Sequence, residues 1–170
     1  MSDALESADT MTVSLAGPEA TMAFAGRLAL VARAGDVIAL SGALGMGKTT
    51  FARGFINALA ATCGQPPEEV PSPTFTLVQT YPFPPFVVYH IDLYRIERPH
   101  DAFELGLEEA FADGVSLVEW PDRLGPHLPA ERLEIVFLPG PDEAGPESRT
   151  LRLDVPDGWR PRITEVVAHG

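Results

Sequence analysis

Gly42-Ala43-Leu44-Gly45-Met46-Gly47-Lys48-Thr49 matches the pattern G-x-x-x-x-G-K-[ST] at every fixed position and directly follows the apolar run 37–40. This pattern is typical of a P-loop, in which backbone N–H groups surround the phosphates of a nucleotide. Its three glycines let the chain curl tightly without a side chain in the way. We expect Lys48 to contact the outer phosphates and Thr49 to ligate Mg²⁺, while Thr50 lies in the first turn of a helix whose dipole favours anions. The sequence therefore predicts a nucleoside triphosphate site at residues 42–50.

The alternative is a glycine-rich turn with Lys48 exposed for solubility. The segment that follows argues against it, because Phe51, Phe55, Ile56 and Leu59 recur at helical spacing and form one apolar stripe. A strand, a glycine-rich loop and a helix in this order are the context that a P-loop requires.

The composition indicates one domain that does not cross a membrane. The chain has 170 residues, 45% of them hydrophobic and 21% charged, and no apolar run approaches the roughly 20 residues that span a bilayer. Residues 1–10 are acidic and lack the pattern of an export signal, so we expect a frayed lead-in and a cytoplasmic protein. The single cysteine, Cys63, suits a reducing compartment.

The net charge of −12 argues against direct binding to nucleic acid, which requires clustered Lys and Arg. Any role on RNA is therefore expected to be indirect, through a partner protein. This charge has two possible roles. The acidic surface either favours a basic partner protein or serves only solubility.

The periodicity predicts an α/β sandwich of the P-loop NTPase type, with a mixed, mostly parallel central sheet. Residues 82–85 are rich in proline and join two strand-like runs, which predicts an antiparallel hairpin. The polar segment 139–148 is expected to be a mobile loop. The strand-like runs are 12–15, 36–41, 76–81, 86–91, 115–118, 131–138 and 150–155. The helix-like runs are 19–33, 48–61, 101–111 with a break at Gly106, and 159–167.

Two carboxylates follow apolar strand-like runs. Asp92 follows the run 87–91 and Glu119 follows the run 115–118. The carboxyl edge of an open α/β sheet faces the ligand, so if both strands flank the P-loop strand, both acids reach the site. One is then expected to bind Mg²⁺ and the other to complete its coordination or orient water. The pattern does not assign these roles, and an acid that merely caps a loop is the alternative.

Other side chains near these acids have open interpretations. His90 is either a proton carrier or metal ligand, or a packed, hydrogen-bonded histidine, which we favour. The hydroxyls of the loop 72–76 form either a phosphate-responsive loop or a plain turn. Arg95 either neutralises transition-state charge or pairs with an acid, and the sequence alone favours the pair. Trp120 is a core or partner-facing aromatic beside Glu119.

Four motifs together resemble one family: the P-loop, S-P-T-F-T-L-V at 72–78, H-x-D-L-Y-R at 90–95 and V-E-W at 118–120. Their order and spacing are similar to those of TsaE (YjeE), the small bacterial ATPase of tRNA threonylcarbamoyladenosine (t6A) synthesis. The resemblance spans about 16–138 and does not extend to the final thirty or so residues.

The resemblance implies a P-loop ATPase that binds ATP and Mg²⁺, hydrolyses ATP slowly alone and works with the proteins TsaD and TsaB, reaching tRNA only through them. It implies that Lys48 binds phosphate, that Thr49 ligates Mg²⁺ and that Asp92 is the Walker-B-like acid. It pairs Glu119 with Trp120 and places Thr74 and Thr76 in a switch-like loop.

Two other functions are compatible with a P-loop. A small-molecule kinase normally needs an arginine-rich lid, and the twelve Lys and Arg of this chain do not cluster in one. An ATP-binding module without turnover is the second alternative. A GTPase is disfavoured because the sequence has no N-K-x-D segment.

Overall fold

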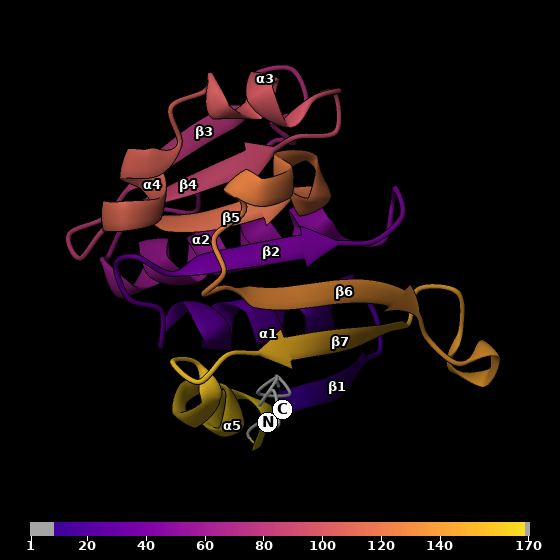
Figure 1. Ribbon diagram of the computed structural model, residues 1–170. Helices are drawn as coiled ribbons and strands as arrows, with labels where there is room; N and C mark the ends of the chain where they lie inside the picture. Colours follow the sequence, from indigo (N-terminus) through magenta and orange to yellow (C-terminus); the bar gives the residue numbers. More distant parts are fainter. Residues whose placement is uncertain (1–8, 169–170) are drawn as a thin grey trace, which may run out of the picture.

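A seven-stranded β-sheet organises the molecule in a computed structural model that describes residues 9–168 (Figure 1). The strands are β1 (Asp9–Leu15), β2 (Val37–Ser41), β3 (Val78–Pro82), β4 (Val87–Asp92), β5 (Val115–Glu119), β6 (Leu133–Pro139) and β7 (Arg149–Val155). The helices are α1 (Pro18–Ala29), α2 (Lys48–Thr62), α3 (Pro99–Phe103), α4 (Glu108–Asp113) and α5 (Arg160–Ala168), with the 3-10 helices η1 (Pro121–His127) and η2 (Asp142–Ala144).

The sheet is mixed, with a parallel centre. Its strand order is β1-β7-β6-β2-β5-β4-β3, and the neighbours β6, β2, β5 and β4 are parallel. The pairs β1/β7, β6/β7 and β3/β4 are antiparallel, so β1 points the same way as the central strands and only β3 and β7 oppose them. The predicted mostly parallel sheet and the predicted hairpin, β3–β4, are both confirmed.

Helices cover the two faces of the sheet differently. On one face α1 and α2 pack against each other and form the main core with the sheet (Figure 1). Helix α5 adds further residues to this core. Gly54 of α2 permits this close approach, since a Cβ there would lie 2.5 Å from the Cα of Met22 in α1. On the other face α3, α4 and η1 enclose a smaller apolar cluster over β4 and β5. The predicted break at Gly106 separates α3 from α4.

Several boundaries differ from the sequence prediction, among them those of β1, β3, β6 and α1. β3 begins at Val78 and not at Thr76, because Leu77 adopts a left-handed φ of 65° and its N–H donates to Pro73 O (2.7 Å) in a turn. α1 ends at Ala29 and not near Arg33, where the Asp36 carboxylate accepts the backbone N–H of Arg33. Of the expected frayed lead-in, residues 1–8 lie outside the described residues, whereas residues 9 and 10 belong to β1.

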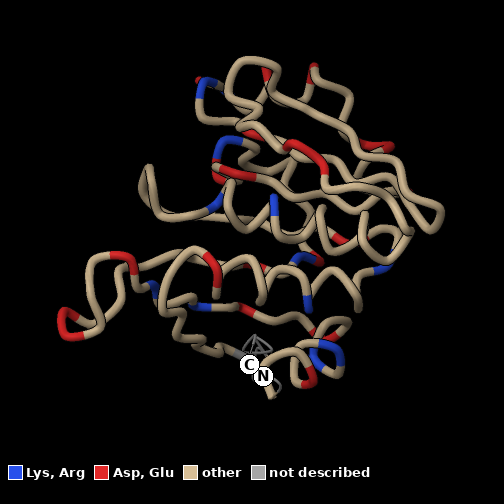
Figure 2. The backbone as a smooth tube through the Cα atoms, turned by 180° about the vertical axis from the view of Figure 1, so that it is seen from behind, with Lys and Arg blue, Asp and Glu red and all other residues tan. Residues whose placement is uncertain are grey.

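The segment 139–148 joins β6 to β7 and projects from the sheet, carrying several acidic residues (Figure 2). It contains η2, and its two ends meet where Gly140 N–H donates to Ser148 O (3.0 Å). Its mobility stays a prediction. No helix within residues 9–168 is both long and apolar enough to cross a bilayer.

Candidate nucleotide-binding site

The carboxyl ends of the central strands form one edge of the sheet, and the P-loop lies at this edge. Glu119 is paired with both Leu40 of β2 and Asp92 of β4 in the strand register. The two predicted acids therefore lie side by side at the ends of neighbouring strands. A cavity of about 300 Å³ opens here. It is lined by Leu44, Gly45, Gly47, Lys48, Thr49, Thr50, Ser72, Thr74, Asp92, Tyr94, Glu119 and Trp120.

The P-loop begins in a space that only glycine fits. Gly42 has a φ of 142°, and a Cβ at this position would lie 2.8 Å from the carbonyl oxygen of Phe137 in β6. The loop then curls to Gly47, the N-cap of α2. The N-terminus of this fifteen-residue helix faces the cavity through Lys48 and Thr49, which favours a bound anion.

Lys48 is held inside the loop by neutral acceptors. Its Nζ donates to Gly42 O (2.7 Å) and Ala43 O (2.9 Å), and it lies 4.5 Å from the centre of the Trp120 ring. Burial lowers the pKa of Lys48 from its ordinary 10.5, while the charges of Glu119 and Asp92 act in the opposite direction. The Lys48 side chain is thus buried at the edge of the cavity, close to both carboxylates.

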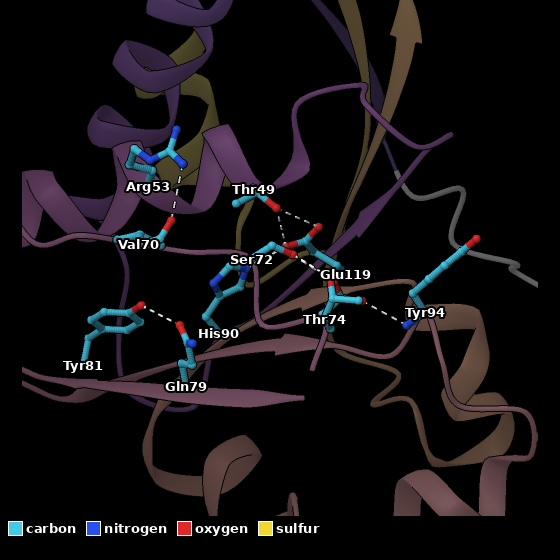
Figure 3. A network of polar contacts seen from close by, with 11 residues as sticks. Thr49, Arg53, Val70, Ser72, Thr74, Gln79, Tyr81, His90, Tyr94 and Glu119 are labelled. Carbon is cyan, nitrogen blue, oxygen red and sulfur yellow. Dashed lines mark hydrogen bonds and ion pairs between the residues drawn. The ribbon is translucent and has the colours of Figure 1, made fainter. Parts of the chain in front are cut away.

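Glu119 connects the P-loop to a buried histidine. Thr49 Oγ1 lies 3.3 and 3.2 Å from the two carboxylate oxygens, and His90 Nε2 lies 2.6 Å from Oε2 (Figure 3). An ionised carboxylate only accepts hydrogen bonds, so Thr49 and His90 are the donors. Glu119 is 3% exposed and His90 is fully buried. The interpretation of His90 as a packed, hydrogen-bonded residue is confirmed.

Asp92 faces the loop 72–77 and not Thr49. Its Oδ2 accepts from Thr74 (3.1 Å) and Ser72 (3.5 Å), and its Oδ1 accepts from the N–H of Tyr94 (2.9 Å). The two hydroxyls also bond each other at 2.7 Å. Ser72, Thr74 and Tyr94 lie together in Figure 3. The carboxylate that meets the P-loop threonine is therefore that of Glu119.

Of the two acid-bearing strands, only one flanks the P-loop strand, so the condition posed from the sequence is met in part. β5 flanks β2, but the other neighbour of β2 is β6, so β4 lies one strand farther away. β6 takes this place by parallel pairing, with Ile38 opposite Leu133. Both Asp92 and Glu119 nevertheless line the cavity, because the site is wider than one strand spacing.

Aromatic side chains close one side of the site. Trp120 has a left-handed φ of 59°, which is uncommon for a residue with a side chain, and its ring lies over Lys48 and 5.0 Å from that of Tyr94. Arg95 is exposed and stacks on Phe75 at 4.2 Å. Arg95 makes no ion pair with any residue that the structure describes, so the salt bridge favoured from sequence is not formed.

Most of the predicted binding residues line the cavity, and three do not. Gly42 and Ala43 contribute carbonyls to Lys48, and Met46 lines a second cavity of about 230 Å³ together with Pro18, Thr21, Gly45, Gly47, Thr50, Glu147 and Arg149. Thr76 is exposed, within the turn that the hydrogen bond from Leu77 to Pro73 closes. Tyr94 and Arg149 were not predicted as site residues from the sequence. Tyr94 lies two residues after Asp92, which is a usable signal, whereas Arg149 has no local signal.

Mg²⁺ fits the oxygen donors present. A hydroxyl (Thr49) and two carboxylates (Glu119 and Asp92) are the ligand types that this ion prefers. Residues 9–168 contain no cluster of three or more His, Cys, Asp or Glu able to hold a metal. Mg²⁺ typically binds through one or two carboxylates together with water and phosphate oxygens, and such a site needs no cluster of this kind.

Comparison with known proteins decides the family. The sequence model described as "Threonylcarbamoyl adenosine biosynthesis protein TsaE" matches residues 15–146. The chain belongs to the TsaE family. This confirms the resemblance drawn from the four motifs, and it supports a role in t6A biosynthesis and tRNA modification.

Individual TsaE relatives extend the match over most of the chain. The tRNA threonylcarbamoyladenosine biosynthesis protein TsaE of Bacillus subtilis (strain 168) is 43% identical over 127 residues, 74% of this chain and 76% of that protein. TsaE of Rickettsia bellii is 40% identical over 117 residues, 69% of this chain and 78% of that protein. The crystal structure of B. subtilis YdiB superposes with a TM-score of 0.74 at 33% identity, covering 95% of this chain and 96% of that one.

Proposed function

We propose that this protein is a Mg²⁺-dependent ATPase that supports t6A modification by acting on a TsaD–TsaB complex. The observation that carries the proposal is the contact between P-loop Thr49 and the buried carboxylate of Glu119, beside the Lys48 ammonium. A phosphate-binding loop, a metal-binding hydroxyl and an acid at the same edge are the parts that nucleotide hydrolysis requires.

Each part has a distinct task. The loop amides, the α2 N-terminus and Lys48 bind the phosphates and offset their negative charge. Thr49 and Glu119 would hold Mg²⁺, with Asp92 as a further oxygen donor, and the ion would neutralise charge that develops on the phosphates. His90 holds Glu119 from behind, so that this carboxylate keeps one orientation.

Asp92 links nucleotide chemistry to the protein surface. It accepts hydrogen bonds from Ser72 and Thr74, and the same loop exposes 80% of the Phe75 side chain. Asp92 would be a donor to the ion and also accepts the hydrogen bonds of this loop, so the loop would respond to an occupied nucleotide site. A partner that contacts the loop can thereby sense the nucleotide.

The partner assignment agrees with the composition. A net charge of −12 disfavours contact with tRNA phosphates, which leaves tRNA binding to other subunits. We propose that the protein works with these subunits in the cytoplasm. The names of the relatives tie them to t6A biosynthesis. TsaD and TsaB remain a proposal taken from the family resemblance.

The test is phosphate release from ATP by Glu119→Gln, measured with and without TsaD–TsaB. We expect ATP binding to persist and turnover to fall by about a hundredfold or more, because the variant keeps the shape and loses the charge. Glu109→Gln, an identical change at an exposed residue of α4, is the matched control.

Three results would contradict the proposal. Wild-type turnover by Glu119→Gln removes this residue from the chemistry. ATP binding by the wild type with no phosphate release in either condition supports the binding module. Phosphoryl transfer that depends on an added acceptor supports a kinase.

A further inference from the structure

We infer that Arg149, at the start of β7, is a positioning residue for the P-loop: it fixes the Met46–Gly47 peptide so that its N–H faces the phosphates. This inference rests on the proposed function, since it assigns a residue to the same nucleotide site. Arg149 lies beyond the segment 15–146 that the TsaE family model matches.

The guanidinium of Arg149 connects two loops that are about a hundred residues apart in sequence. Its Nε donates to Met46 O (3.0 Å) and its Nη2 to Gly45 O (3.4 Å). Its Nη1 donates to Pro146 O (2.9 Å) and Ser148 O (2.8 Å). These four bonds all end on backbone carbonyls, so Arg149 ties the P-loop to the segment before β7.

The bond to Met46 O determines where the next N–H points. A trans peptide is planar, and its C=O and N–H point in opposite directions. With the oxygen of Met46 bound to Arg149, on the side of the second cavity, the N–H of Gly47 points away from Arg149. Gly47 caps α2 and lines both cavities, whereas Arg149 lines only the second. An N–H directed away from Arg149 therefore belongs to the phosphate-binding set at the main cavity.

This peptide also needs an anchor, because its N–H belongs to a glycine. Gly47 has a φ of 111° and Gly45 a φ of 78°, and glycine adopts positive and negative φ about equally well. The Met46–Gly47 peptide can therefore flip at little steric cost. By contrast, the preceding N–H of Met46 is already bonded within the loop, to Ala43 O (3.3 Å).

Arginine suits this task and lysine does not. A guanidinium presents five N–H donors in a rigid planar fork, whereas an ammonium is a point charge on a flexible stem. A lysine reaching Met46 O cannot hold Gly45, Pro146 and Ser148 at the same time. The requirement is for geometry and not only for positive charge.

The test compares Arg149→Met and Arg149→Lys with Arg152→Met, a matched change at an exposed arginine of the same strand. ADP binding in the presence of Mg²⁺ is measured by calorimetry. The amide signals of Gly45, Met46 and Gly47 are measured by NMR on the protein without added nucleotide. We expect both Arg149 variants to bind ADP about tenfold more weakly, about 1.4 kcal/mol. We also expect their loop amide signals to broaden or split, and Arg152→Met to match the wild type in both measurements.

Two results would overturn the inference. Wild-type ADP affinity in Arg149→Lys shows that charge alone is needed, so that Arg149 acts on the phosphates directly. Unchanged loop amide signals in Arg149→Met show that the residue does not hold the peptide. If the wild type binds no ADP, the proposed function fails, while the NMR comparison still decides whether Arg149 anchors the loop.

Discussion

The hydrogen bond between His90 and Glu119 predicts a difference between two otherwise similar substitutions. In His90→Gln the side-chain amide nitrogen reaches about as far as Nε2, whereas in His90→Asn it reaches only as far as Nδ1. In the structure Nε2 bonds Glu119 at 2.6 Å, and Nδ1 has no partner among residues 9–168. Glutamine therefore keeps the donor to Glu119 and asparagine loses it.

The size of the effect follows from burial. Glu119 is 3% exposed and His90 is fully buried, so water does not replace the lost donor. A hydrogen bond to a charged group contributes about 1.5–3 kcal/mol. We expect His90→Asn to lose at least about 2 kcal/mol of unfolding free energy and His90→Gln less than about 1 kcal/mol. For a chain of this length, each kcal/mol lowers Tm by about 2–4 °C.

The assay is thermal and urea unfolding of the two variants, together with phosphate release. His90→Asn is expected to lower turnover more than ATP affinity, because Glu119 loses its orientation while Lys48 keeps its own contacts. Equal Tm values for the asparagine and glutamine variants would refute the reasoning, since asparagine loses the donor to Glu119 that glutamine keeps.

The remaining predictions concern the P-loop, the neighbouring loop and α5. Lys48→Met should weaken ADP binding at least about tenfold yet stabilise the protein near about pH 7. A lowered lysine pKa means that the folded state disfavours the ammonium, and this penalty fades as pH rises through that pKa toward 10.5. The Tm of Lys48→Met should therefore exceed that of the wild type by less at about pH 10 than at about pH 7. A Tm difference that grows with pH would contradict a lowered lysine pKa. Thr74→Val removes a 3.1 Å bond to a carboxylate and should lower the unfolding free energy by about 1 kcal/mol in urea titration, where no change would show that the bond is absent in solution. Arg162→Met breaks a pair of bonds of 2.7 and 3.1 Å to Asp36, both groups being nearly buried. This substitution should lower the free energy of unfolding by about 3 kcal/mol. The exposed control Arg160→Met should lower it by less than about 1 kcal/mol. Equal losses of Tm in the two variants would refute the difference between the two ion pairs.

The contiguous parts of the site could be predicted from sequence because their chemistry is local. The P-loop needs only residues 42–49 and the strand before it, so its pattern carries both conformation and ligand class. Asp92 and Glu119 were found by a similar argument, since an acid after an apolar run lies at the edge where ligands bind. The break at Gly106 also follows from one residue and its neighbours.

The other features depend on which elements meet in space. Strand order is a long-range choice, and nothing near Val37 indicates that β6 and not β4 pairs beside it. The separate contacts of the two acids follow from that choice, because Glu119 ends next to the P-loop and Asp92 one strand away. Arg149 acts across about a hundred residues, and Leu77 takes a left-handed φ that its residue type disfavours.

Trp120, whose backbone is left-handed, places its fluorescent ring beside the P-loop lysine. The chain has two tryptophans, and the other, Trp159, is 3% exposed beneath the Arg162 guanidinium, in the core that α5 shares with α1. Only Trp120 places its indole over the P-loop lysine. In Trp159→Phe the remaining emission therefore comes from a fluorophore in the wall of the cavity, and its intensity follows occupancy without any attached dye.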